Sequence, residues 1–180
     1  MKSLLDDVMP DYDVHEVHSL WVPANQEEAY EAVRAVSARE VRLFRPLMRL
    51  RTFGRSERVL APQAPLLEEM LKIGFVQLAE RPDEEIVVGA IGHFWSPTRN
   101  RPVAAPDFST FAEPGYAKAA MNFRVTPDGD GSRITTETRV VGTDAEATRK
   151  FRRYWFAIRL GSGAIRRSWL KAIRRRISEG

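Results

Sequence analysis

Cysteine is absent from this chain of 180 residues, and histidine occurs only three times. Without cysteine there is no disulfide and no thiolate chemistry, which fits a reducing cytosolic compartment. No apolar run approaches the roughly 18 residues of a membrane-spanning helix, and residues 1–12 lack the apolar core of a secretory signal. We therefore expect a cytoplasmic protein that neither spans a bilayer nor carries a standard export signal.

The motifs of several catalytic classes are missing too. The chain has no G-x-S-x-G elbow, no glycine-rich phosphate loop and no Glu-x-x-His or His-x-x-x-His spacing for a metal. Nucleophilic catalysis and metal ligation therefore have no support in the sequence. We predict no metal site and no cofactor.

The charge that is present is unevenly distributed. The net charge is +4, yet eleven Lys or Arg and no Asp or Glu lie between Arg149 and Arg176. Such a stretch attracts phosphate or anionic lipid, and it equally suits the solvated back of an amphipathic helix. No aromatic residues interleave on the basic face to stack bases, so we predict no nucleic-acid partner. Peripheral contact with an anionic membrane stays open.

Residues 144–180 indicate one long helix. Thr143 and Glu146 match the capping-box spacing at its start. Its apolar face repeats at helical spacing through Ala147, Phe151, Tyr154, Trp155, Ile158, Ile165, Trp169, Ile173 and Ile177. A helix of this length spans roughly 50 Å, which only a broad curved sheet covers. The glycines of Gly161-Ser162-Gly163 indicate a kink, the close approach of a ligand, or tight helix–sheet packing.

The remaining elements are shorter, and together with the final helix they predict one domain over residues 13–178 behind a flexible N-terminal arm, 1–12. Alternating apolar residues and turn signals predict strands over 15–22, 75–80, 84–92, 116–126 and 133–141. Helices are predicted after an Asn25 cap, over 38–52 with a break at Pro46, and from Pro65 to Ile73.

Small and hydroxylated side chains on the last two strands are expected to face the long helix, where they leave room for a cavity. The hydroxyls among them need partners or water. The predicted lining of a ligand pocket is Ala117, Ala119, Met121, Phe123, Thr136, Thr138, Phe151, Tyr154, Trp155 and Ile158.

The residues His18-Ser19-Leu20-Trp21-Val22-Pro23-Ala24, followed by Glu28, Tyr30 and Val33, resemble the opening strand and first helix of the START-related proteins, the SRPBCC superfamily. Residues 111–120 and the run Phe151-Arg152-Arg153-Tyr154-Trp155 resemble an uncharacterised bacterial branch of it. The resemblance covers residues 13–178. It implies an α+β helix-grip fold, in which a curved antiparallel sheet wraps around a long C-terminal helix beside two or three shorter helices. It also implies a hydrophobic cavity between sheet and helix.

Three functions fit these patterns. The first is binding or carriage of a small hydrophobic molecule such as a lipid, fatty acid or polyketide. The second is a polyketide cyclase or aromatase, whose catalytic candidates are Tyr154 on the helix and His93 at a strand end, where His93 is either a general base or structural. The third is a basic module that docks on an anionic membrane. The oligomeric state stays open.

Overall fold

Five antiparallel strands form one sheet in the computed structural model, which describes residues 2–44, 46–47, 61–96 and 107–179. The sheet order is β1-β5-β4-β3-β2. The strands are β1 (Val14–Val22), β2 (Val76–Arg81), β3 (Glu85–Gly92), β4 (Ala117–Asp128) and β5 (Gly131–Gly142). The helices are α1 (Leu4–Val8), α2 (Gln26–Ala35), α4 (Leu66–Lys72) and α5 (Ala145–Glu179).

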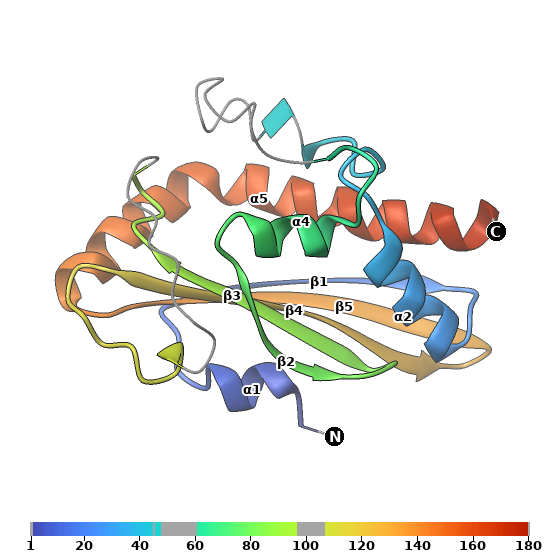
Figure 1. The fold of residues 1–180 in the computed structure, drawn as a ribbon, viewed down its shortest axis with the longest axis horizontal. Helices are drawn as coiled ribbons and strands as arrows, with labels where there is room; N and C mark the ends of the chain where they lie inside the picture. The colour runs from blue at the N-terminus through green and yellow to red at the C-terminus, as the bar shows by residue number, and fades with distance from the viewer. Residues whose placement is uncertain (1, 45, 48–60, 97–106, 180) are drawn as a thin grey trace.

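One face of the sheet carries α2, α4 and α5, and the other carries α1 (Figure 1). The main core lies on the first face, where apolar side chains of α2, α4 and α5 pack against β3, β4 and β5. A smaller cluster under α1 fills the second face. This arrangement confirms the predicted α+β helix-grip fold, with the long C-terminal helix against an antiparallel sheet.

The hairpin of β4 and β5 is longer than its sequence pattern suggested. Asp128 pairs directly with Gly131, so only two residues form the turn, and Gly129 adopts a positive φ of 67°. Two-residue hairpin turns need such a backbone conformation, which glycine adopts without strain. The predicted inner face is confirmed, because Met121, Phe123 and Ile134 all enter the main core.

Capping residues set the starts of two helices. Asn25 forms the predicted capping box with Glu28 at the start of α2. At the start of α5 the cap is Asp144, whose Oδ1 accepts a hydrogen bond of 2.7 Å from the Ala147 N–H. This corrects the prediction of a Thr143 cap. The Thr143 hydroxyl instead contacts the backbone of Tyr116, which ties the helix start to the residue just before β4.

The N-terminal residues are helical and packed, which corrects the prediction of a flexible arm. Leu5 of α1 is fully buried, and Met9 just beyond it is 3% exposed. Both pack against the outer face of β3 and β4. The physical reason is a second apolar face on the sheet, formed by residues such as Val87 and Ile91, which needs a cover.

The region after α2 departs from its prediction in part. Residues 38–43 are turns and bends, so no helix begins at Ala38, and residues 48–52 lie outside the described part of the chain. No helix within the described ranges is both long and apolar enough to cross a bilayer.

Candidate functional site

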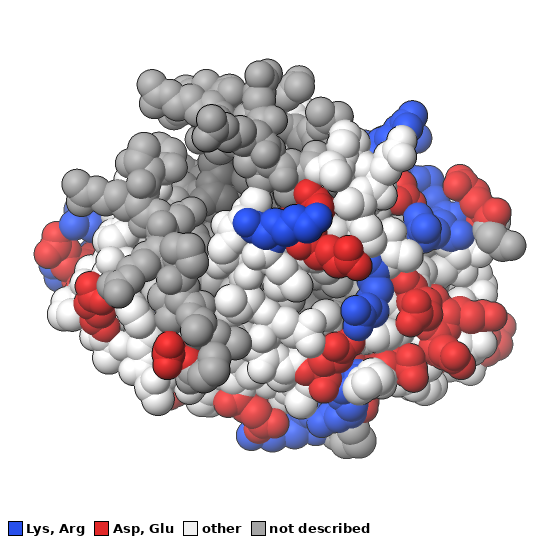
Figure 2. All heavy atoms as spheres, in the orientation of Figure 1, with Lys and Arg blue, Asp and Glu red and all other residues white. Residues whose placement is uncertain are grey.

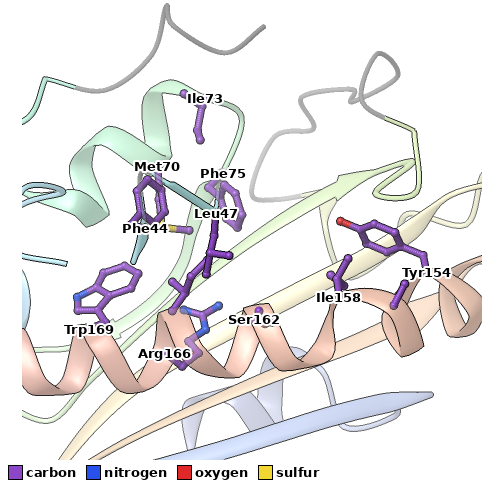
Figure 3. A pocket seen from close by; sticks show the side chains of 13 residues that line it. Phe44, Leu47, Met70, Ile73, Phe75, Tyr154, Ile158, Ser162, Arg166 and Trp169 are labelled. Atoms are coloured by element: carbon purple, nitrogen blue, oxygen red, sulfur yellow. The ribbon is translucent and has the colours of Figure 1, made fainter. Parts of the chain in front are cut away.

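A pocket of about 580 Å³ lies between α5 and the elements that face it from the α4 side of the fold (Figure 3). The α4 side contributes only apolar side chains, namely Phe44, Leu47, Met70, Ile73 and Phe75. The α5 side contributes Tyr154, Ala157, Ile158, Gly161, Ser162, Ile165, Arg166 and Trp169. The volume falls within the roughly 300–1,000 Å³ of small-molecule sites.

The α5 side of the pocket follows from helical periodicity. Tyr154, Ile158 and Ile165 belong to the apolar stripe of the helix, and Trp169 continues it into the core. Residues three or four positions apart stand above one another on a helix, so the stripe forms a continuous wall. Trp169 closes one end of this wall, with its ring 4.8 Å from that of Phe123.

The two glycines of α5 have different surroundings, and the helix runs through both without interruption. Among the described residues, a Cβ on Gly161 would have only Leu47 within 4 Å, at 4.0 Å, and Gly161 lines the pocket. A Cβ on Gly163 would lie 2.5 Å from Glu16 Oε1. The absence of a side chain at Gly161 therefore leaves space in the pocket, whereas at Gly163 it lets the helix approach β1.

Arg166 is the one charged residue in the described lining of the pocket. It is half-buried, and its guanidinium lies 5.8 Å from the ring centre of Trp169. Burial lowers the pKa of Arg166 to about 10, while the negative charge of Glu16 acts in the opposite direction. The side chain therefore remains a cation at neutral pH.

Glu16 and His18 lie beneath the middle of α5, on the inner face of β1. Glu16 Oε1 is 2.8 Å from His18 Nε2, and both side chains are mostly buried. The other carboxylate oxygen of Glu16 is buried and has no hydrogen-bond partner among the described residues. This pair therefore places negative charge close behind the wall that carries Arg166.

The predicted lining on the β4–β5 hairpin lies outside the pocket. Met121 and Phe123 are buried in the main core, where the Trp169 ring fills the space next to Phe123. The Thr136 hydroxyl is buried and donates a hydrogen bond of 2.8 Å to the Asn122 carbonyl, so the backbone satisfies it. Thr138 is half-buried beside Met121 in the register of the hairpin.

Four further predicted residues form a separate packed cluster near the start of α5. Ala117 and Ala119 of β4 pack against Phe151, and Trp155 stacks on Phe151 with a ring separation of 6.0 Å. The large rings of the helix fill the room that the small alanines leave. Of the ten predicted lining residues, the structure places Tyr154 and Ile158 in the pocket wall.

The two catalytic candidates, Tyr154 and His93, lie in different parts of the structure. Tyr154 lines the pocket, and its ring lies near that of Phe151. His93 does not line the pocket and packs against the rings of Tyr116 and Trp95, at 4.3 and 5.7 Å. The geometry therefore brings only Tyr154 to the pocket.

Sequence reasoning missed the α4 wall and Arg166. No sequence signal links Phe44 and Phe75 to the final helix, because their proximity depends on the tertiary fold. Arg166 did leave a signal, since it stands between Ile165 and Trp169 on the apolar side of an amphipathic helix. A lone arginine there is costly unless it has a partner.

Potential metal ligands do not gather in the described part of the chain, where no group of three or more His, Cys, Asp or Glu side chains occurs. The described pocket wall offers one guanidinium, two hydroxyls and an indole among apolar groups. Its chemistry is that of a binding site for an apolar molecule with few polar groups.

Comparison with known proteins gave structural likenesses only, since no family model and no curated sequence matched the chain. Protein MLL2253 of Mesorhizobium loti is 13% identical with a TM-score of 0.42, over 90% of this chain and 98% of that one. Protein CV1439 of Chromobacterium violaceum is 13% identical with a TM-score of 0.39, over 92% and 99%. CalU16 of Micromonospora echinospora is 12% identical with a TM-score of 0.32, over 92% and 84%. Likenesses this distant indicate no function, and the pocket is the feature that points to one.

Proposed function

We propose that this chain binds or carries a small hydrophobic molecule, such as a lipid, fatty acid or polyketide, in the pocket between α4 and α5. We also propose that it belongs with the START-related proteins that its sequence resembles. The observation that carries the proposal is a space of about 580 Å³ walled mainly by apolar side chains. Unfilled apolar space of this size costs stability, which a bound ligand recovers.

Filling the pocket tests this proposal. Gly161→Phe places a ring where, of the described residues, only Leu47 is near, so it should abolish binding without a clash in the core. Leu160→Phe is the matched control, because Leu160 is 77% exposed and does not line the pocket. Native mass spectrometry of the purified protein and thermal shifts with fatty acids and aromatic polyketides should reveal binding by the wild type and by Leu160→Phe, but not by Gly161→Phe. The proposal fails if no compound binds the wild type, or if all three proteins bind alike.

An enzymatic version of the same site would rest on Tyr154 and Arg166, which both line the pocket. These groups can orient a polyketide chain and polarise a carbonyl. A cyclase or aromatase also needs a proton acceptor, and the described lining includes no histidine or carboxylate. Binding without turnover is therefore the function that we favour.

Contact with an anionic membrane is a second candidate, favoured by the exposed side of α5. Phe156 and Leu160, which are 73% and 77% exposed, stand one helical turn apart beside the exposed Arg153 and Arg159. Apolar and cationic side chains together bind the surface of anionic bilayers. Acidic side chains gather instead over α2 in the view of Figure 2.

Vesicle sedimentation tests this second candidate. We expect the protein to sediment with vesicles that contain phosphatidylserine and to be released by salt, because screening weakens surface electrostatics. Phe156→Ser should reduce this binding severalfold. Val17→Ser on β1, also an exposed apolar position at 48%, should not change it. Equal binding to neutral phosphatidylcholine vesicles, or no binding at all, would remove this candidate.

A further inference from the structure

We propose that the pocket selects ligands with one carboxylate group at the end of an apolar body, and that Arg166 binds this carboxylate. The inference rests on the proposed function, because it names the class of molecule that the same pocket takes. It starts from a cation in the wall of an otherwise apolar site.

The guanidinium of Arg166 points into the pocket. Figure 3 shows its side chain rising from α5 toward Leu47 on the opposite wall, with Trp169 beside it. The Trp169 ring lies 5.8 Å from the guanidinium carbon and holds it by a cation–π contact. The cation is thus positioned toward the space that a ligand would occupy.

Arg166 has no hydrogen bond or ion pair with any residue in the described ranges. Burial nevertheless costs its charge enough to lower the pKa to about 10. A half-buried cation that no carboxylate contacts directly destabilises a fold, and proteins keep such groups chiefly at functional sites. A carboxylate brought by a ligand would supply the missing partner, and the fork of the guanidinium matches its two oxygens.

The local charge favours a ligand with a single negative charge. The negative charge of Glu16 already interacts electrostatically with Arg166, and one oxygen of this carboxylate is buried without a hydrogen-bond partner among the described residues. A phosphate ester with two charges would therefore meet repulsion that a carboxylate largely avoids. Carboxylate and phosphate ligands share an anionic head group on an apolar body. They differ in the charge of the head group, which is one for a carboxylate and about two for a phosphate ester.

The length of the pocket defines the apolar body. Its α5 wall extends from Tyr154 to Trp169, which is about 20 Å at the rise of a helix. Arg166 lies near one end of this wall and Tyr154 lies at the other. The wall between these two residues includes Ile158 and Ile165. A straight acyl chain whose carboxylate meets Arg166 can extend along this wall toward Tyr154.

Binding measurements with three probes of equal chain length test the inference. Dodecanoate, dodecanol and dodecyl phosphate are titrated calorimetrically, below their micellar concentrations, into wild type, Arg166→Met, Arg166→Lys and Arg174→Met. Arg174 is an exposed arginine on the same helix, outside the pocket lining, and controls for the loss of one charge. Wild type and Arg174→Met should bind dodecanoate more tightly than either other probe.

Arg166→Met should weaken dodecanoate binding at least about tenfold and change dodecanol binding less than about twofold, because it removes one desolvated charge contact. The affinity of Arg166→Lys for dodecanoate should lie between those of the wild type and Arg166→Met, since lysine keeps the charge but loses the two-pronged hydrogen bonding of a guanidinium. Ligand-free Arg166→Met should also unfold at a temperature equal to or above that of the wild type. A structural arginine would give the opposite shift.

Three results would overturn the inference, and one of them separates it from the proposed function. If dodecanol and dodecanoate bind with equal affinity and Arg166→Met changes neither affinity, the pocket binds apolar molecules without recognising a carboxylate. If dodecyl phosphate binds best, the head group is not a carboxylate. If ligand-free Arg166→Met is less stable than wild type, Arg166 serves the fold. Failure of every probe to bind the wild type would remove the proposed function as well.

Discussion

Buried polar side chains in this protein differ in whether the chain itself supplies their partners. Glu85 is fully buried, and its carboxyl group accepts hydrogen bonds from Ser3 Oγ, the Leu4 N–H and Asn122 Nδ2, at 2.5 to 2.9 Å. It therefore holds the start of α1 against the sheet. Arg166 has no comparable set of partners within the described ranges. This difference is why we assign Glu85 to the fold and Arg166 to a ligand.

The satisfied carboxyl of Glu85 yields a prediction about stability. Glu85→Ala should lower the free energy of unfolding by about 2–3 kcal/mol, because several buried donors lose their acceptor at once. Glu68→Ala, at an exposed position on α4, should change it by less than about 0.5 kcal/mol. Urea denaturation followed by circular dichroism measures both. Equal, small effects would mean that α1 does not depend on Glu85.

Single residues also show where reasoning from sequence stops. Asn25 and its capping box were predictable, because the pattern is local. The choice between Thr143 and its neighbour Asp144 was not, because Thr143 forms hydrogen bonds with the backbone of Tyr116, the residue before β4. The role of Glu85 was equally hidden, since its partners lie 37 to 82 positions away.

At the scale of elements, α5 serves as core helix and pocket wall at once. Its C-terminal half carries Trp169 and Ile173 into the main core, while the turns before it line the pocket. Helical periodicity predicted this element and its apolar stripe. The packed helix α1 was missed because its five residues are too short for periodicity to register.

The two glycines of α5 allow a matched test of how the helix is seated. Gly161→Ala should stabilise the protein by about 1 kcal/mol, because alanine favours helix and, within the described part of the chain, the new methyl group would be near only Leu47. Gly163→Ala should be less stable than Gly161→Ala by about 1 kcal/mol or more, because its methyl group displaces the Glu16 carboxylate from His18.

Thermal denaturation of the two glycine variants gives the comparison directly. The small methyl group of Gly161→Ala should also leave ligand binding intact, unlike the ring of Gly161→Phe. Equal stability of the two alanine variants would show that α5 does not approach β1 as closely as the distances indicate.

At the scale of the whole molecule, the fold was predictable and the position of the pocket was not. The order of strands and helices, with a long amphipathic helix at the end, is enough to indicate an antiparallel sheet around that helix. The pocket was expected between β4, β5 and α5, where small residues such as Ala117 line the sheet. The rings of Phe151 and Trp169 pack against that part of the sheet, and the pocket that the described residues line lies between α4 and α5. Which of two neighbouring spaces stays open depends on side-chain volumes in three dimensions.

A crystal structure of the full chain with dodecanoate would test the account most directly. We predict electron density for the acyl chain between α4 and α5, along Ile158 and Ile165, with its carboxylate within hydrogen-bonding distance of the Arg166 guanidinium. A chain bound elsewhere on the protein, or one whose carboxylate points away from Arg166 toward solvent, would contradict the account.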